Sequence, residues 1–183
     1  MTGNAFLAVD LSTDERHALA AALDEASPGP RIPGKRVRPE NWHITMRFIG
    51  PVDEVATDLV LHEVSETLDA TAGRVVCTGL GAFPRPAKAT VLYVGIDDPA
   101  ELLPSIAAQC EAACRDVGLE PQERPFIGHL TLSRIRPPTD VTRLIGSFGE
   151  FAVPIRVASV SLMRTTPDER GVRYTEIGSF PLR

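Results

Sequence analysis

Short apolar segments with the alternation of β-strands recur along the whole chain, and several are joined by connections too short to bring parallel strands together. Only residues 81–89 separate the strand expected at 74–80 from the one at 90–96, and only residues 164–171 separate the segments near 151–163 and 172–181. Parallel neighbours need a crossover of a dozen or more residues, whereas antiparallel neighbours accept a short turn. The connections therefore predict a mainly antiparallel sheet.

Helical periodicity occurs between these strands, with capping residues or breakers at the helix ends. The expected strands are 5–11, 42–49, 74–80, 90–96, 128–135, 151–163 and 172–181, and the expected helices are 13–26, 53–70, 97–117 and 141–146. Helices mixed with antiparallel strands favour an α+β fold over a doubly wound parallel sheet. Pro137 and Pro138 are expected to end the strand before them.

The segment 27–41 contains four prolines and several basic residues. The prolines predict that it has no regular structure. Its basic residues have no acidic neighbour before Glu40, which fits either a solvated loop or a loop that faces an anion beside a site. They are Arg31, Lys35, Arg36 and Arg38.

Size and charge limit the partners. The 183 residues fit one domain, 1–183, built as two small lobes that share a sheet. The net charge of −5 is unlike proteins that grip long duplex nucleic acid through its phosphates, so any such contact is expected to be local, at a strand end or a small nucleotide. No apolar run is long enough to span a membrane and no secretory signal is visible, so we expect a cytoplasmic monomer without a membrane partner.

Two tetrads of the form His-apolar-Thr-apolar lie in two expected strands, at residues 43–46 (HITM) and 129–132 (HLTL). Side chains at i and i+2 of a strand point to one face. Each tetrad therefore presents an imidazole and a hydroxyl together, with its apolar residues behind them. One tetrad lies in each half of the chain, which suggests an internal duplication and two histidines that face each other.

Two facing histidines suit a reaction in which one takes a proton from the nucleophile while the other gives a proton to the leaving group. The hydroxyls of Thr45 and Thr131 can hydrogen-bond the oxygens of a phosphate. Because the tetrads are nearly equivalent, the residues alone leave open whether His43 or His129 is the acid.

An arginine would complement a phosphate site, and one follows each tetrad. Arg134 is the favoured candidate, although strict alternation points it away from His129, so it needs a β-bulge or the strand's end to reach the site. Arg47 has the same parity as His43 but fits a surface strand residue equally well.

Metal binding is the rival use of paired histidines, with Asp10 as a third ligand. Zinc sites usually have three or four protein ligands, and no H-E-x-x-H motif or finger-type cysteine pair occurs here, so we expect no metal. His17 and His62 are interpreted as ordinary helix residues. The three cysteines are interpreted as small buried apolar residues: Cys77, Cys110 and Cys114.

The tetrads and their surroundings resemble the 2H phosphoesterase family, in particular its RNA 2′,3′-cyclic phosphodiesterase branch, first described as a 2′-5′ RNA ligase. The resemblance spans nearly the whole chain. It is carried by residues 38–50 (RPENWHITMRFIG), 81–84 (GAFP) and 124–134 (RPFIGHLTLSR), by Phe6 and Asp10 in the first strand, and by the closing strand 174–182. The resemblance implies a bilobal α+β fold with helices packed outside and two-fold pseudo-symmetry around a central groove.

The resemblance also implies an activity without metal or cofactor. The substrate would be an RNA end or a nucleotide with a 2′,3′-cyclic phosphate, tRNA fragments among the candidates, and the product a 2′-phosphomonoester. His43 would protonate the departing 3′ oxygen and His129 would activate water, while Thr45, Thr131 and Arg134 would hold the phosphate.

Several alternatives stay open. The same site could join a cyclic-phosphate end to a 5′-hydroxyl, or the protein could bind RNA ends without turnover. Phe83 and Phe126 are candidates for contacts with the base, though both also fit the core, and the basic segment 31–38 could guide the RNA backbone.

Overall fold

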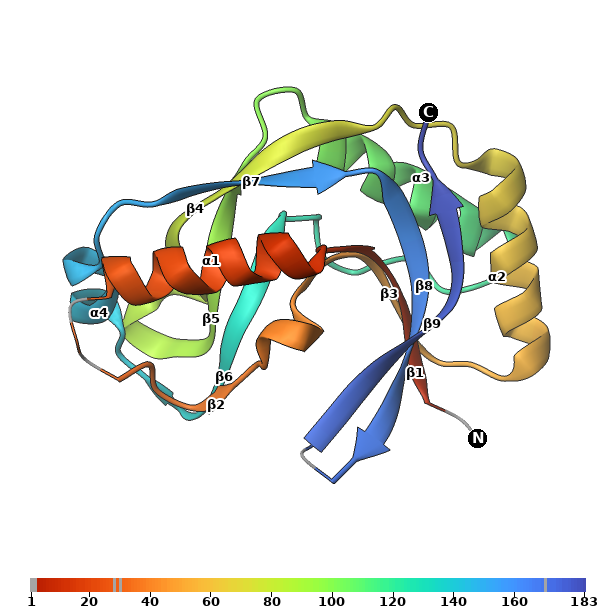
Figure 1. The fold of residues 1–183 in the computed structure, drawn as a ribbon. Coiled ribbons are helices and arrows are strands. Elements are labelled where there is room, and N and C mark those ends of the chain that lie inside the picture. The colour runs from red at the N-terminus through yellow and green to blue at the C-terminus, as the bar shows by residue number, and fades with distance from the viewer. Residues whose placement is uncertain (1–2, 28, 30, 170) are drawn as a thin grey trace.

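A computed structural model describes residues 3–183 except 28, 30 and 170. Its strands are β1 (Asn4–Asp10), β2 (Lys35–Arg36), β3 (His43–Pro51), β4 (Gly73–Phe83), β5 (Ala89–Asp97), β6 (His129–Thr139), β7 (Ala152–Val157), β8 (Ser159–Asp168) and β9 (Gly171–Pro181). Its α-helices are α1 (Thr13–Ala26), α2 (Glu54–Thr67), α3 (Leu102–Asp116) and α4 (Thr142–Ser147), and η1 (Pro39–Asn41) and η2 (Pro86–Lys88) are short 3₁₀ helices (Figure 1).

The strands form one antiparallel sheet in the order β7-β4-β5-β6-β3-β1-β8-β9, with β2 paired to β6. The predicted α+β fold with a mainly antiparallel sheet is confirmed. Two four-stranded halves meet in the middle, where β3 pairs with β6. The two strands that carry the histidine tetrads are therefore central neighbours.

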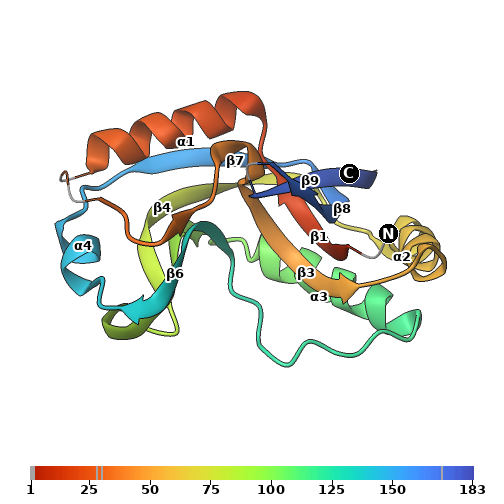
Figure 2. The same cartoon turned by 90° about the horizontal axis from the view of Figure 1, so that it is seen from below.

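The two halves repeat one arrangement. In one half β1, α1 and β3 follow one another, and in the other β5, α3 and β6 do so, with the tetrad strand last each time. The helices cross over: α1 follows β1 but packs against β7 of the other half, while α3 follows β5 and packs against β3. Figures 1 and 2 both show α1 along β7 and α3 beside β3. This exchange couples the halves and gives the molecule an approximate two-fold arrangement.

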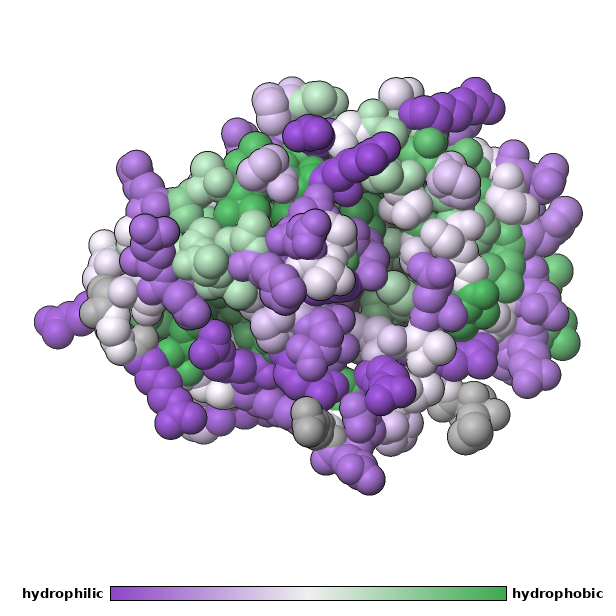
Figure 3. Space-filling view, in the orientation of Figure 1, coloured by the Kyte–Doolittle hydropathy of each residue, from purple (hydrophilic) through white to green (hydrophobic). Residues whose placement is uncertain are grey.

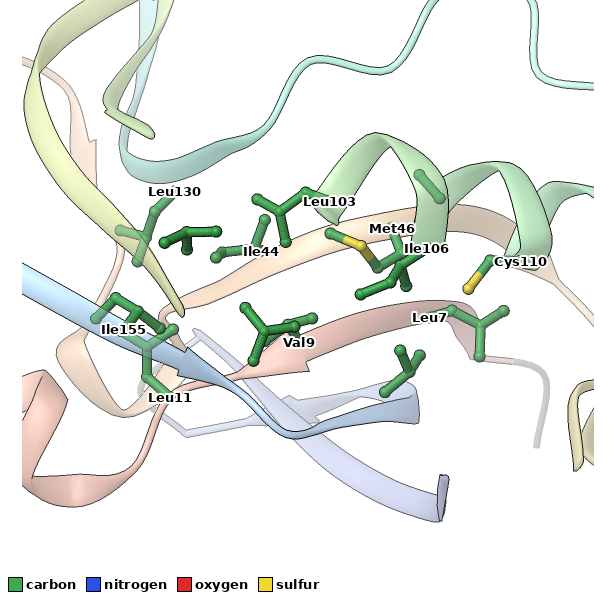
Figure 4. Packing of buried hydrophobic residues seen from close by; sticks show 14 of the residues in the cluster. Leu7, Val9, Leu11, Ile44, Met46, Leu103, Ile106, Cys110, Leu130 and Ile155 are labelled. Carbon is green, nitrogen blue, oxygen red and sulfur yellow. The ribbon is translucent and has the colours of Figure 1, made fainter. Parts of the chain in front are cut away.

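The main core lies between one face of the sheet and the three long helices. Leu7 and Val9 of β1, Ile44 of β3 and Leu130 of β6 pack there, together with Ile106 of α3 (Figure 4). Because Ile44 and Leu130 are fully buried on this side, the histidines and threonines on either side of them project from the opposite face. The helices thus occupy one side of the sheet and leave the other side to the tetrads.

The prediction that residues 27–41 have no regular structure is wrong within the described part of that segment. Lys35–Arg36 form β2, and Pro39–Asn41 form η1. A proline is tolerated in the first turn of a helix, where its missing N–H has no partner anyway, and Pro39 occupies that position. Pro28 and Pro30 lie outside the described residues.

Two strand ends also differ from expectation. β6 continues through Pro137 and Pro138 to Thr139. Neither proline has a partner in the pairing with β2 or with β5, so both lie at an irregular part of the strand, where a proline is tolerated. β4 continues to Phe83, through residues expected to be a loop.

The expected strand 151–163 is two strands that lie in different halves of the sheet. β7 pairs with β4, and after Ala158 the chain enters β8, which pairs with β1. Both strands are apolar and alternating, so the local pattern contains no sign of the change of partner. The three cysteines are buried and free, as expected, and no helix in the described ranges is long and apolar enough to cross a membrane.

Candidate active site

The pairing of β3 with β6 brings the two tetrads together. Ile44 of the first lies opposite Leu130 of the second. Because the strands are antiparallel, the residues on either side of this pair are also near one another, and they share the face away from the core. We call this surface the site face, defined by the half-buried side chains of His43, Thr45, His129 and Thr131.

His43 is held by its own strand and by aromatic rings. Its Nδ1 lies 2.8 Å from the carbonyl oxygen of Asn41, and its Nε2 lies 3.1 Å from Oγ1 of Thr45. The ring of Phe6 lies against the imidazole with 4.7 Å between centroids, and the ring of Tyr174 meets it edge-on at 5.0 Å. These contacts leave the imidazole little freedom to rotate.

His129 has the same kind of surroundings. Its Nδ1 lies 2.8 Å from the carbonyl oxygen of Ile127, again two residues earlier in the chain. The rings of Phe83 and Tyr93, which stack on each other, meet the imidazole edge-on at 5.0 and 5.3 Å. Each histidine is therefore oriented by one backbone carbonyl, one phenylalanine and one tyrosine.

The two carbonyl contacts determine the tautomer of both rings. A carbonyl oxygen only accepts, so Nδ1 of each imidazole carries a proton and donates it. Nε2 is then the nitrogen that gains or loses a proton in both His43 and His129. Thr45 can donate to Nε2 of a neutral His43 or accept from a protonated one.

The pKa values of both histidines are lowered from the ordinary 6.5. For His43 the main cause is burial; the Asn41 carbonyl and the Asp10 carboxylate oppose it, and the positive charges of Arg134 and His129 add to it. For His129 burial and Arg134 lower the pKa, and the carbonyl of Ile127 raises it. The charges of Arg134 and His129 thus act at His43, which places these groups near one another.

The β-bulge that Arg134 needs is present. Tyr93 of β5 pairs with Thr131, but the preceding Leu92 pairs with Ser133, so Leu132 is an extra residue in β6. Leu132 and Ser133 are both buried. The alternation changes there, and exposed Arg134 comes to the face of Thr131.

A second β-bulge, in β3, removes Arg47 from the site face. Ala8 of β1 pairs with Thr45 and Leu7 pairs with Arg47, so Met46 is an extra residue in β3. Arg47 therefore points into the core side, where it is 4% exposed and its Nε lies 2.5 Å from a carboxylate oxygen of Glu111 on α3. The parity argued for Arg47 from strict alternation is wrong, because it assumed an unbroken strand.

The structure separates the other candidates. Phe83 contacts His129, whereas Phe126 packs against the main core. Asp10 lies opposite His43 in the β1–β3 pairing and is ion-paired with Arg16 of α1. His17 and His62 are exposed helix residues.

Three aromatic neighbours and Asn41 were not predicted from the sequence to contact the histidines. Phe6 is in the first strand, Tyr93 pairs with Thr131, and Tyr174 comes from the β8–β9 hairpin. Asn41 is buried, and its Nδ2 donates to the carbonyl of Val172 on that hairpin at 2.9 Å. The alternation of β5 would have placed Tyr93 beside the second tetrad only if the pairing of β5 with β6 had been known. No local sequence pattern identifies Tyr174 or Asn41 as a neighbour of His43.

A small cavity of about 50 Å³ lies behind His43. Asp10, Arg16 and Glu40 line it together with Asn41 and Tyr174. This volume suffices for one or two water molecules but not for a nucleotide. Elsewhere in the described ranges, no three His, Cys, Asp or Glu side chains come together as a metal site would require.

Comparison with known proteins agrees with this geometry. The model of the 2′-5′ RNA ligase superfamily matches residues 11–169. A protein of Aeropyrum pernix named RNA 2′,3′-cyclic phosphodiesterase is 33% identical over 161 residues, covering 84% of this chain and 89% of the relative. A protein of the same name from Methanothermobacter thermautotrophicus is 30% identical over the full length of both chains (100% of each).

Solved structures share the fold. E. coli LigT complexed with 3′-AMP superposes with a TM-score of 0.83 at 20% identity, covering 100% of this chain and 99% of that one. A protein of Thermus thermophilus superposes with a TM-score of 0.81 at 24% identity, covering 98% of both chains. At these identities the likeness concerns the arrangement of helices and strands.

Proposed function

The chain belongs to the 2′-5′ RNA ligase superfamily, whose members include 2H phosphoesterases, and from this premise we propose that it hydrolyses 2′,3′-cyclic phosphates at the ends of RNA or on nucleotides. The product is a 2′-phosphomonoester with a free 3′-hydroxyl. Two relatives at 30% identity or more bear the name of this activity.

His129 acts as the general base and His43 as the general acid. Nε2 of His129 takes a proton from water as the water oxygen bonds to phosphorus, and Nε2 of His43 gives its proton to the 3′ oxygen as the P–O3′ bond breaks. Each turnover leaves His43 neutral and His129 protonated, and exchange with solvent restores both. Nothing else is consumed besides water.

The surroundings of the two histidines support this division of roles. Asp10 is paired opposite His43, and its carboxylate favours the protonated imidazole that an acid requires. At the corresponding place beside His129 the partner residue is Gly95, which has no side-chain charge. Arg134 lowers the pKa of both histidines, so the carboxylate of Asp10 is the charge that distinguishes them.

Thr45, Thr131 and Arg134 hold the phosphate. The two hydroxyls flank the junction of β3 and β6, and the guanidinium joins them through the bulge at Leu132. Hydrogen-bond donors fixed before the reaction stabilise the charge that develops on the non-bridging oxygens. Both threonines are on rigid strands, so little reorganisation is needed.

The observation that carries the proposal is that both imidazoles are oriented in the same way. In each case Nδ1 lies 2.8 Å from the backbone carbonyl oxygen of the residue two positions before the histidine. This contact commits Nε2 of both rings to proton transfer. A purely structural histidine needs no such duplicated orientation.

The test is turnover of the four 2′,3′-cyclic mononucleotides in EDTA, with identification of the product isomer. We expect full activity and 2′-phosphates only. His43→Ala and His129→Ala should each lower kcat by at least about a hundredfold while the protein stays folded, and exposed His17→Ala should leave kcat unchanged. Near-normal turnover of either site variant would exclude the two-histidine mechanism, and loss of activity in EDTA would point to a metal enzyme.

Incubation with RNA halves that end in a 2′,3′-cyclic phosphate and a 5′-hydroxyl separates hydrolysis from ligation. Hydrolysis yields a 2′-phosphate end, whereas ligation yields a 2′-5′ joined product from the same acid–base pair. Binding without either product would leave the protein a module that captures RNA ends.

A further inference from the structure

The basic residues between β1 and β3 do not act as one patch. Arg38 is engaged by the β8–β9 hairpin: its guanidinium lies 3.4 Å from a carboxylate oxygen of Asp168 and donates to the carbonyl of Val172 at 3.0 Å. Lys35 and Arg36 are exposed and make no ion pair within the described residues. These two alternate on β2, so they point to opposite faces of the sheet.

Lys35 is fixed beside Arg134. The two residues are direct partners in the β2–β6 pairing, whereas Arg36 is paired with buried Ser133. Residues that are directly opposite one another share a face, so the ammonium group of Lys35 is on the side of Arg134. The bulge at Leu132 brings exposed Arg134 to the face of Thr131, so this side is the site face.

Local backbone geometry makes this placement specific. Gly34 has a φ of +82°, and a Cβ there would come within 2.4 Å of the carbonyl oxygen of Arg134. A glycine is required for the chain to approach β6 this closely. The backbone N–H of Val37 donates to the carbonyl of Leu132 at 2.8 Å, which fixes the chain on the C-terminal side of Lys35 to β6 as well.

The side chain of Lys35 extends across to the β8–β9 hairpin. A Cβ added to Gly171 would lie 3.3 Å from its Nζ, so the ammonium group lies beside the end of β9. The hairpin extends beyond the body of the sheet in Figure 1, and hydrophilic side chains gather over the lower part of the molecule in the same view in Figure 3. Asp168, an acidic residue of that hairpin, is paired with Arg38.

Two cations directly opposite one another repel, and no acidic side chain in the described ranges forms an ion pair with either. An arrangement of this kind is typical of a site for an anion. Arg134 is already assigned to the reacting phosphate. The neighbouring cation, Lys35, is therefore available to a second phosphate of the same substrate.

We infer that Lys35 forms a second phosphate subsite, which binds the phosphate on the 5′ oxygen of the nucleotide that carries the 2′,3′-cyclic phosphate. The inference rests on the proposed function for the identity of the first phosphate. It narrows the substrate class to 5′-phosphorylated nucleotides and RNA ends, since both present a phosphate at this position, over nucleosides with a free 5′-hydroxyl.

The test compares three substrates: adenosine 2′,3′-cyclic phosphate, the same nucleotide with a 5′-phosphate, and a dinucleotide that ends in adenosine 2′,3′-cyclic phosphate. We expect KM to be about tenfold lower for the last two, as for one added charge-assisted contact. Lys35→Gln should abolish this preference and leave kcat on the first substrate unchanged. Arg36→Gln removes the same charge from the neighbouring residue on the other face and should keep the preference.

Binding of products makes the result independent of turnover. We expect adenosine 2′,5′-bisphosphate to bind the wild-type protein about tenfold more tightly than adenosine 2′-phosphate, and Lys35→Gln to bind both equally. Equal affinities in the wild type, or a difference that survives Lys35→Gln, would overturn the subsite. Absence of turnover on all three cyclic substrates would instead overturn the proposed function. A preference for the dinucleotide alone would assign the subsite to RNA and not to free nucleotides.

Discussion

Asp10 makes two otherwise similar histidines different. The residues that flank the two imidazoles match closely, but only His43 has a carboxylate that raises its pKa. The ion pair with Arg16 holds that carboxylate in place. In the mechanism we propose, the direction of proton transfer thus depends on Asp10, a residue outside both tetrads.

We expect this difference to be visible in the pH dependence of kcat/KM. Because the pKa values of both histidines are below 6.5, the maximum should lie below pH 6.5, with the low-pH limb set by the base His129 and the high-pH limb by the acid His43. Asp10→Asn removes a group that raises the pKa of His43, so the high-pH limb should move to lower pH while the other limb stays.

Asp14→Asn is the matched control, since Asp14 is an exposed acid in the first turn of α1. Its profile should coincide with that of the wild type. A shift of the low-pH limb in Asp10→Asn would mean that His43 is the base, and an unchanged profile would mean that Asp10 does not act on His43.

The two arginines that follow the tetrads should respond to mutation in opposite ways. Arg134→Gln should lower kcat/KM about a hundredfold, as for the loss of one donor to a developing charge, with the free energy of unfolding within about 0.5 kcal/mol of the wild type. Arg47→Gln should lower the free energy of unfolding by about 3 kcal/mol, because it leaves Glu111 without its partner.

Urea unfolding and kcat/KM per folded molecule, measured for both variants, check this pair. Arg47→Gln should retain the catalytic constants of the wild type. Loss of catalysis in Arg47→Gln without loss of stability would show that Arg47 reaches the substrate after all.

At the scale of elements, the β8–β9 hairpin supports His43 from outside the tetrad strand. Tyr174 of β9 meets the imidazole, and Asn41 connects the two: its side chain donates to Val172, and its carbonyl accepts from His43. Arg38, which precedes β3, forms an ion pair with Asp168 of the same hairpin. The position of the hairpin and the orientation of the imidazole are therefore linked directly by Tyr174 and through Asn41.

Asn41→Ala should loosen this link. We expect it to lower the free energy of unfolding by about 1–2 kcal/mol and to lower kcat several-fold, because the hairpin no longer holds the segment that orients His43. Asp53→Ala is a control of similar cost, about 1 kcal/mol, since it removes the side chain that caps α2, a helix that begins beyond the other end of β3. Equal kcat in the two variants would show that the hairpin contributes stability alone.

At the scale of the whole molecule, the two halves of the sheet depend on each other. Their strands meet at the Ile44–Leu130 pair, and each half is covered by a helix that follows a strand of the other. The main core crosses the junction without a break. The site is assembled at the same junction, so its geometry depends on the halves staying together.

We expect Leu130→Ala to lower the free energy of unfolding by about 2–5 kcal/mol, as for a large side chain removed from a core, with a single cooperative transition. Ile44→Ala combined with it should show a coupling of about 0.5–3 kcal/mol in a double-mutant cycle, since the two side chains are direct neighbours. Thermal and urea unfolding followed by far-UV circular dichroism measure both quantities. Two separate transitions would show that the halves fold independently.

The sequence by itself determined those features that depend on neighbours along the chain. Alternation and helical periodicity placed most strands and helices, short connections implied the antiparallel sheet, and the spacing within each tetrad put His43 with Thr45 and His129 with Thr131. Ser12 and Glu15 likewise predict the start of α1, where the structure has a capping box. In each case the interacting groups are within a few residues, where bond geometry restricts the outcome.

Only the tertiary structure decided which strands become neighbours, because pairing between distant segments depends on the packing of the whole core. Apolar alternation continues through Ala158, yet the chain changes from one half of the sheet to the other there. The bulges at Met46 and Leu132 are likewise features of the pairing with β1 and β5, which are distant in the sequence or separated by a helix. They exchange the faces expected for Arg47 and Arg134, and long-range pairing alone brings Lys35 opposite Arg134 and Tyr174 against His43.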